Sequence, residues 1–314
     1  MKIIGAGITG ATIARILTDR GIKVTVYERG EIGGMCADYR KDGILVHKNG
    51  AHIWHNSDGE VQEFVERFTK FNEYVHIVKA SYHGRLYDFP VNLNTFRQVC
   101  GITTEAEARK CHPNIMQEMF FKEYSLKQWG AMPPQEILNR VPIRYNDDNR
   151  YFTDRWQGIP VDGYKVMIEN MLDGIEVIHE NCHNADIVTG TIDEYYAYKL
   201  GVLPYRSMNF LHETRAAEYF QDVAIVNYTD ETPYTRIIEH KHFEKVKTDN
   251  TIITYEFPRQ WEPGMDRHYP MFDFDLYKKY TNLGGPIFAG RLGSYEYLNM
   301  NIAVKKAIEL CKQI

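Results

Sequence analysis

Three glycines near the start of the chain, Gly5, Gly7 and Gly10, have the spacing that lets a backbone approach a phosphate. The first allows a tight turn, the second admits a pyrophosphate, and the third lets a helix pack closely on a strand. The free N–H groups at the N-terminus of the helix then attract the anion. Glu28 follows 18 residues after Gly10, where a carboxylate can accept hydrogen bonds from ribose hydroxyls. The pattern predicts a dinucleotide site.

The residues around these glycines predict the elements that such a site needs. Residues 2–5 read as a buried strand, residues 11–21 as a helix and residues 23–28 as a second strand. A phosphate-binding loop of the nucleotidase type is excluded, because no Gly-Lys-Ser/Thr sequence follows the glycines.

A second glycine pair, Gly33-Gly34, follows Glu28 closely. This arrangement is common where FAD lies along the domain surface, and an acid at the end of the second strand disfavours the 2′-phosphate of NADP. We therefore predict FAD rather than NAD, with Arg29 and Gly34 added to the cofactor-binding residues.

Composition excludes several classes of protein. The 314 residues carry a net charge of −5, so no overall basic field predicts binding to nucleic acid or to anionic lipid. Five cysteines without a C-x-x-C pair argue against a disulfide framework and favour a reducing, cytoplasmic location. No apolar stretch is long enough for a membrane span, and we read no secretion signal. The 22 tyrosines suit stacking on bases and sugars, although a Tyr-rich core fits them equally.

The rest of the chain predicts further elements. Residues 31–60 read as a loop region, 61–74 as an amphipathic helix, and 75–90 as two strands around the turn His83-Gly84. Helical patterning fills 94–140, and residues 196–262 suggest an antiparallel sheet. A last buried strand is expected at 286–290, and a closing helix at 302–312.

Six segments, in this order along the chain, resemble the UDP-galactopyranose mutase family. No single one is decisive, but six in order are highly specific. They are residues 50–56, 124–130, 140–144, 151–160, 233–243 and 290–297.

The resemblance implies an α/β fold with three units. These are an FAD-binding Rossmann-like domain over 1–73, 162–193 and 284–314, a reduced helical domain with a mobile loop over 94–146, and an antiparallel sheet domain over 74–93, 147–161 and 194–283.

The resemblance also implies an unusual reaction without net redox change, the interconversion of UDP-galactopyranose and UDP-galactofuranose. N5 of reduced FAD would attack the anomeric carbon, UDP would leave, and the flavin–sugar adduct would open to an iminium. The ring would reclose through a different hydroxyl before UDP returns. An unidentified electron donor must then keep the FAD reduced.

Site residues follow from the resemblance, position by position. Arg140, on the mobile loop, and Arg236 would clamp the diphosphate, with Arg206 as a weaker third candidate; planar guanidinium groups suit phosphate oxygens. His55 completes the predicted catalytic set. His52 would lie beside the isoalloxazine, and Arg291 would stabilise the anionic reduced flavin.

Substrate contacts are implied in the same way. Phe120, Tyr124 and Phe152 would form a stacking shelf for uracil, although Phe120 taken alone reads better as a core residue. The other predicted substrate-binding residues are Ser125, Trp129, Tyr151, Asn227, Tyr269 and Tyr297.

Two histidine pairs leave a metal site open as an alternative. His52-x-x-His55 and Glu239-His240-x-His242 have ligand residue types, but neither has a third ligand at metal spacing. We predict no metal.

Three departures from the family pattern affect the interpretation. The chain is short between Gly101 and Phe120, inside the unit that usually carries the dimer contact, so a monomer or a non-standard homodimer is expected. Asn299 stands where the family has Asp, and Met35 where Asn is usual.

Other functions stay open at this point. The same chemistry could act on another nucleotide sugar, such as UDP-N-acetylgalactosamine or UDP-arabinopyranose. A true FAD oxidoreductase of this fold is the second reading, and a catalytically inactive nucleotide-sugar binding protein is the third.

Overall fold

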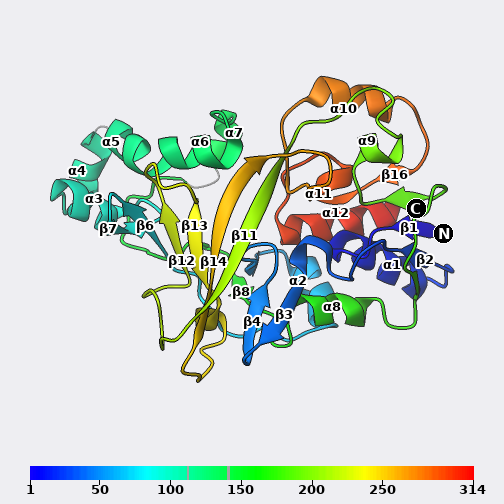
Figure 1. Ribbon diagram of the computed structural model, residues 1–314, viewed down its shortest axis with the longest axis horizontal. Helices are drawn as coiled ribbons and strands as arrows, with labels where there is room; N and C mark the ends of the chain where they lie inside the picture. Colours follow the sequence, from blue (N-terminus) through cyan, green and yellow to red (C-terminus); the bar gives the residue numbers. More distant parts are fainter. Residues whose placement is uncertain (112, 140–141) are drawn as a thin grey trace.

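The computed structural model describes residues 1–111, 113–139 and 142–314. Two main sheets form its body, and a group of helices covers one end (Figure 1). Both chain termini lie beside the smaller sheet, at the opposite end of the molecule from the helical group. Arg140, one of the two predicted diphosphate ligands, lies outside the described residues.

The smaller sheet has five parallel strands in the order β16-β10-β1-β2-β9, which is a Rossmann-like arrangement and confirms the predicted fold class. The strands are β1 (Lys2–Ile4), β2 (Thr25–Tyr27), β9 (Glu176–Ile178), β10 (Ile187–Val188) and β16 (Ile287–Phe288). The predicted last strand is present, but its predicted burial is wrong. It lies at the sheet edge, and Ile287 is 39% exposed.

Helices cover this parallel sheet. Small residues such as Ala11 and Ala14 line the buried face of the first helix, which lets neighbouring elements approach it closely. The helix predicted at residues 302–312 is confirmed. The three helices are α1 (Ile8–Asp19), α8 (Tyr164–Met171) and α12 (Met300–Gln313).

The prediction that residues 31–60 form only loops is wrong. They contain η1 (Gly34–Cys36), β3 (Asp38–Lys41), β4 (Ile44–His47), β5 (Trp54–Asn56) and the start of α2 (Gly59–Glu66). The strands are three or four residues long, so a periodicity of two barely develops in the sequence. The helix predicted over 61–74 begins after its cap, Asp58, and ends at Glu66.

The larger sheet has seven strands in the order β15-β11-β14-β13-β12-β6-β7. The expected strands around His83-Gly84 are present as β6 and β7, and the pairing is antiparallel except between β6 and β12. The strands are β6 (Val78–Tyr82), β7 (Arg85–Phe89), β11 (Tyr205–Arg215), β12 (Ile225–Tyr228), β13 (Arg236–Glu239), β14 (Thr251–Gln260) and β15 (Tyr269–Pro270). A further strand, β8 (Trp156–Gly158), pairs with β5.

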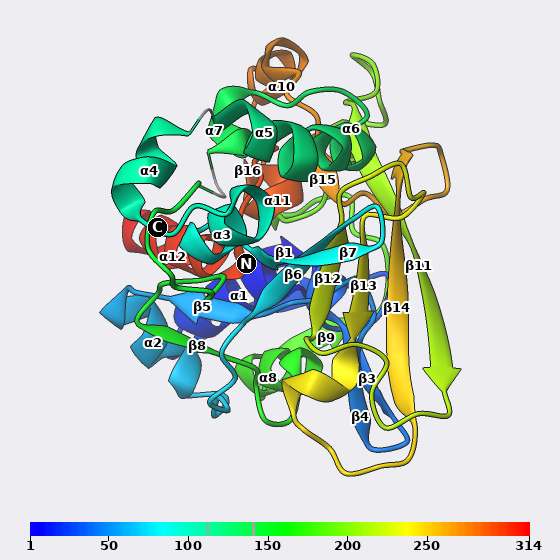
Figure 2. The same ribbon diagram turned by 90° about the vertical axis from the view of Figure 1, so that its left-hand side faces the viewer.

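The helical group confirms the patterning over 94–140 and lies on the near side of the sheet in Figure 2. A π-helical turn, η2 (Glu118–Lys122), joins two of its α-helices. The α-helices are α3 (Leu93–Cys100), α4 (Glu105–Lys110), α5 (Pro113–Gln117), α6 (Glu123–Trp129) and α7 (Gln135–Leu138).

Short helices complete the fold: α9 (Ile192–Tyr195), η3 (His240–Phe243), α10 (Phe274–Thr281) and α11 (Gly290–Gly293). One hydrophobic core lies within the Rossmann-like unit and a second joins the larger sheet to the helical group. Among the described residues, no helix has the length and apolar character needed to cross a membrane.

Candidate functional site

The turn between β1 and α1 contains the three predicted phosphate-binding glycines, and the space around each one differs. Gly5 has φ +101°, and a Cβ there would lie 2.1 Å from Oγ1 of Thr189. A Cβ on Gly10 would lie 1.9 Å from the carbonyl oxygen of Gly5, so close packing demands glycine at both positions. A Cβ on Gly7 would meet no neighbouring atom nearer than 3.9 Å. Nothing in the fold requires glycine at Gly7, so its open face is available to a ligand.

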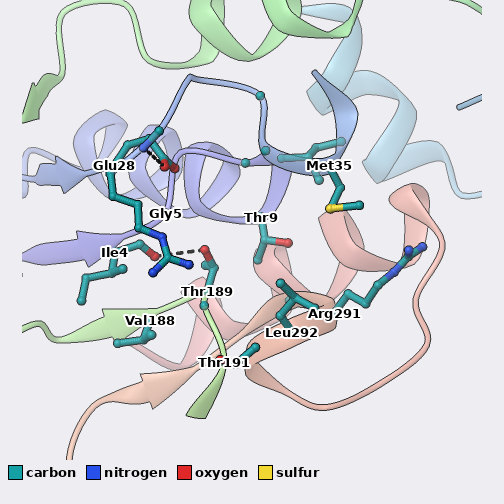
Figure 3. A pocket seen from close by; sticks show the side chains of 18 of the residues that line it. Ile4, Gly5, Thr9, Glu28, Met35, Val188, Thr189, Thr191, Arg291 and Leu292 are labelled. Atoms are coloured by element: carbon teal, nitrogen blue, oxygen red, sulfur yellow. Dashed lines mark hydrogen bonds between the residues drawn. The ribbon is translucent and has the colours of Figure 1, made fainter. Parts of the chain in front are cut away.

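A cavity of about 650 Å³ begins at this turn. At one end, Glu28 accepts hydrogen bonds from the backbone N–H groups of Ala6 and Gly30, both at 2.8 Å. These bonds hold the carboxylate at the cavity edge (Figure 3). Arg29 lines the same end but pairs with Glu194 at 2.5 Å, and its side chain is 67% exposed.

The other end of the cavity carries Arg291 and Met35 (Figure 3). Arg291 donates from Nε and a terminal nitrogen to the carbonyl oxygen of Leu298, at 3.1 and 2.6 Å. His52 donates from Nδ1 to the carbonyl oxygen of Gly50, at 2.8 Å. Burial lowers the pKa of His52 to about 4, so the imidazole is neutral and its Nε2 is an acceptor. A cation and an acceptor therefore lie together at this end.

These features fit a dinucleotide. The phosphate-binding turn, the carboxylate and the cationic end lie along one elongated cavity, and Gly34, with φ +55°, lets the chain pass Gly7 closely.

A second cavity of about 170 Å³ adjoins the first. It is lined by five of the ten predicted substrate-binding residues and by two of the predicted catalytic set, Arg236 and His55. The two cavities share Met35, Asn49, His52, Arg291, Asn299 and Met300, and the second is also lined by His55, Tyr151, Phe152, Asn227, Arg236, Tyr269 and Tyr297.

Arg236 enters this second cavity from β13. Its Nε lies 3.0 Å from Oε2 of Glu256, and a terminal nitrogen donates to the hydroxyl of Tyr124 on α6. Burial raises the pKa of Glu256 and Arg236 opposes that shift. The side chains of Arg236 and Glu256 are 25% and 4% exposed, so the ion pair is partly buried. Sequence reasoning missed Glu256, because one glutamate within a strand carries no signal of its own.

His55 is held on two sides. Its Nδ1 lies 2.9 Å from Oδ2 of Asp154, and Nδ2 of Asn299 lies 3.3 Å from its Nε2. Its ring stacks on Phe152 with centroids 3.8 Å apart. The structure thus places the family departure Asn299 directly beside a predicted catalytic residue. Asp154 was not predicted.

Two tyrosines that line the second cavity, Tyr269 and Tyr297, pack against Trp129. Trp129, at the end of α6, lies 5.6 Å from Tyr269 and 5.3 Å from Tyr297 between ring centroids. The guanidinium of Arg291 lies over both tyrosines, at 5.6 and 5.2 Å. Ser125 is buried on the same helix.

Five predicted substrate-binding residues do not line the second cavity: Phe120, Tyr124, Ser125, Trp129 and Arg206. Phe120 is 1% exposed and packs against Tyr87 and Phe89, as the core alternative expected. Arg206 donates from Nε to the carbonyl oxygen of Gln128 at 3.1 Å and from a terminal nitrogen to that of Lys127 at 2.9 Å. It therefore binds the C-terminal carbonyls of α6.

Neither histidine pair assembles a metal site. His242 lies 3.2 Å from Glu239, and His240 hydrogen-bonds to Thr254. Over residues 1–111, 113–139 and 142–314, no group of three metal-ligating side chains converges.

Comparison with known proteins supports the family resemblance found in the sequence. A model of the UDP-galactopyranose mutase family matches residues 119–297, and a model of NAD(P)-binding Rossmann-like domains matches residues 3–68. A dTDP-fucopyranose mutase of Escherichia coli is 34% identical, covering 99% of this chain and 97% of the relative. A probable UDP-galactopyranose mutase of Klebsiella pneumoniae is 32% identical, covering 98% and 93%.

Solved structures agree on the fold. Reduced UDP-galactopyranose mutase superposes with a TM-score of 0.74 at 14% identity, covering 99% of this chain and 94% of that one. Putrescine oxidase bound to putrescine has a TM-score of 0.58 at 13% identity, covering 99% and 98%. Full-length similarity at 34% identity and a family match over more than half of the chain identify the family. This chain therefore belongs to the UDP-galactopyranose mutase family and is a flavin-binding isomerase.

Proposed function

We propose that the protein interconverts the pyranose and furanose forms of a nucleoside diphosphate sugar on reduced FAD, with UDP-galactose as the first substrate to test. The adjoining cavities carry this proposal. The large one suits FAD, the small one contains a partly buried arginine, and the two share six residues. A sugar held in the small cavity would lie against the flavin end of the large one.

When bound, reduced flavin would supply the nucleophile for the anomeric carbon of the sugar, and the nucleoside diphosphate would be the leaving group. The chain must bind that leaving group and stabilise its charge. Arg236 is suited to the diphosphate because Glu256 and Tyr124 orient its guanidinium. By resemblance, Arg140 acts as the second cation.

Other residues of the site bind and orient. Phe152 and Tyr151 line the small cavity, and Asn227 presents a buried Oδ1 without a hydrogen-bond partner among the described residues. A sugar hydroxyl could donate to this acceptor. Arg291 would stabilise negative charge on the reduced flavin, and neutral His52 would accept a hydrogen bond at the same end.

A 6-deoxy sugar on dTDP is the second candidate substrate. The observation that favours it is the 34% identity to a dTDP-fucopyranose mutase, against 32% to a probable UDP-galactopyranose mutase. UDP-N-acetylgalactosamine and UDP-arabinopyranose complete the set to be tested.

We also assign the units by the ranges predicted from the sequence, with α3–α7 as the helical domain. The aligned region of the Escherichia coli relative spans 369 positions against 314 residues here, so the relative has additional residues. With the helical unit shortened, we propose a monomer or a non-standard homodimer, which sedimentation would distinguish.

The test is a panel of the four pyranose substrates with dithionite-reduced, FAD-loaded protein, analysed by chromatography for the furanose product. Turnover of one pair supports the proposal and names the substrate. Substrate-dependent reduction of oxidised flavin without furanose formation would instead identify an oxidoreductase.

A further inference from the structure

A lysine outside the predicted site is held by three backbone carbonyl groups. Nζ of Lys127 donates to the carbonyl oxygens of Tyr228 and Thr232 at 2.8 Å each, and of Tyr234 at 3.1 Å. Tyr228 is the last residue of β12, and Thr232 and Tyr234 lie in the connection to β13, which begins at Arg236. An ammonium group has three donors, so every donor of Lys127 is used.

The same helix touches Arg236 itself. Tyr124, three residues before Lys127 on α6, accepts a hydrogen bond from the Arg236 guanidinium. Residues three apart lie on one helix face, so Tyr124 and Lys127 join α6 to the same hairpin at two points. Arg206 holds the end of α6 by donating to the carbonyl oxygens of Lys127 and Gln128.

The three carbonyl groups need the ammonium group of Lys127 as their hydrogen-bond donor. Without a donor, three carbonyl dipoles would point at one another in a partly buried space, and each would lose its hydrogen bond. The connection would relax outward to reach water. Tyr234, which supplies one carbonyl, is only two residues from Arg236, so this movement would reach the guanidinium.

We propose that Lys127 is a positioning residue for diphosphate binding, which acts by fixing the β12–β13 connection and with it the guanidinium of Arg236. This inference rests on the proposed function, because it assumes that Arg236 binds the diphosphate.

The charge of Lys127 gives a signature that a purely structural role would not show. Burial lowers the pKa of Lys127 to about 8, and the nearby carboxylates of Asp230, Glu123 and Glu231 oppose the shift. Above this pH the amine keeps only two N–H donors for three carbonyls. Diphosphate affinity should therefore fall as the pH rises through about 8.

The experiment measures the dissociation constant of UDP, with dTDP in parallel, for the FAD-loaded protein between pH 7 and 9.5. Lys127→Met should weaken binding about tenfold at pH 7, the loss expected from about 1.4 kcal/mol. Lys127→Arg should keep most of the affinity and lose the alkaline decline, because arginine stays charged. Lys122→Met is the matched control, since Lys122 is exposed on the adjoining turn and pairs with Glu118.

A double-mutant cycle with Arg236→Lys separates positioning from general loss of structure. If Lys127 acts through Arg236, adding Lys127→Met to the Arg236→Lys protein should change the dissociation constant less than about twofold, because coupled residues are not additive. Equal losses in both backgrounds would overturn the inference, as would unchanged affinity in Lys127→Met. Wild-type protein that binds neither UDP nor dTDP would overturn the proposed function as well. Thermal midpoints of all variants report folding.

Discussion

Asn299 donates a hydrogen bond from its amide nitrogen to Nε2 of His55, across 3.3 Å. An amide nitrogen can only donate, so Nε2 accepts and the ring proton resides on Nδ1, which faces Asp154 at 2.9 Å. The imidazole is thereby oriented between Asn299 and Asp154. An aspartate, the residue that the family pattern has at this position, could not donate this bond when ionised.

Asn299→Asp should therefore change the charge state of His55. Two flanking carboxylates favour an imidazolium with both nitrogens protonated. We expect the acidic limb of the pH–rate profile to move, and histidine ¹⁵N chemical shifts to report the second N–H. A control is Asp154→Asn, which removes the other carboxylate and should favour the neutral ring. Identical profiles for wild type and Asn299→Asp would contradict this account of His55.

Replacing Arg236 tests the diphosphate contact. Arg236→Ala should lower kcat/KM by about 10² to 10³, the loss typical of one preorganised charged contact. It also leaves Glu256 buried without its cation, so unfolding should be followed in parallel. Arg259→Ala on the exposed end of β14 is the control and should have little effect. Full activity in Arg236→Ala would remove Arg236 from the mechanism.

Alanine substitutions separate the roles of the glycines in the first turn. Gly10→Ala should prevent normal folding, because its Cβ would lie 1.9 Å from the Gly5 carbonyl oxygen. Gly7→Ala should fold but retain little FAD, since its Cβ would point into space that the fold leaves open. Gly59→Ala, where a Cβ meets nothing within 4 Å, should be neutral. The measurements are circular dichroism and the flavin-to-protein absorbance ratio. Normal FAD content in Gly7→Ala would argue against a phosphate at this turn.

Buried histidines predict acid sensitivity. Burial lowers the pKa of His52 and His268 to about 4, and that of His76 and His240 to about 3. The unfolded chain protonates them near pH 6.5 and the folded chain does not, so their stabilising effect is complete above that pH and is lost as the pH falls toward 4. Each can contribute a slope of up to about 1.4 kcal/mol per pH unit.

Urea unfolding at pH 7, 6 and 5 measures this slope, with FAD removed so that cofactor loss does not contribute. His240→Asn should reduce the slope, while His179→Asn should not, because His179 is exposed. Unfolding free energies that do not change over this range would contradict the burial of neutral histidines.

The features that the sequence predicted well are those whose residues lie close together along the chain. The roles of Gly5 and Gly10 depend on neighbours within one strand–turn–helix, so their pattern is complete in ten residues. The seven-stranded sheet was also predictable in outline, because β11 and β14 are long enough to show their composition. Short strands such as β3 and β5 were not predictable.

Residues that act through distant partners could not be predicted. Asp154 lies 99 residues from His55 along the chain, and buried Glu256 resembles any surface glutamate in sequence. Arg206 and Lys127 bind backbone carbonyls, which leave no trace in side-chain identity.

Isomerisation by reduced, FAD-loaded protein tests the central claim most directly. We predict that dithionite-reduced protein converts a pyranose nucleotide sugar of the panel to its furanose, that oxidised protein does so far more slowly, and that the flavin is still reduced afterwards. Protein that retains FAD but produces no furanose from any of the four substrates would contradict the proposed function.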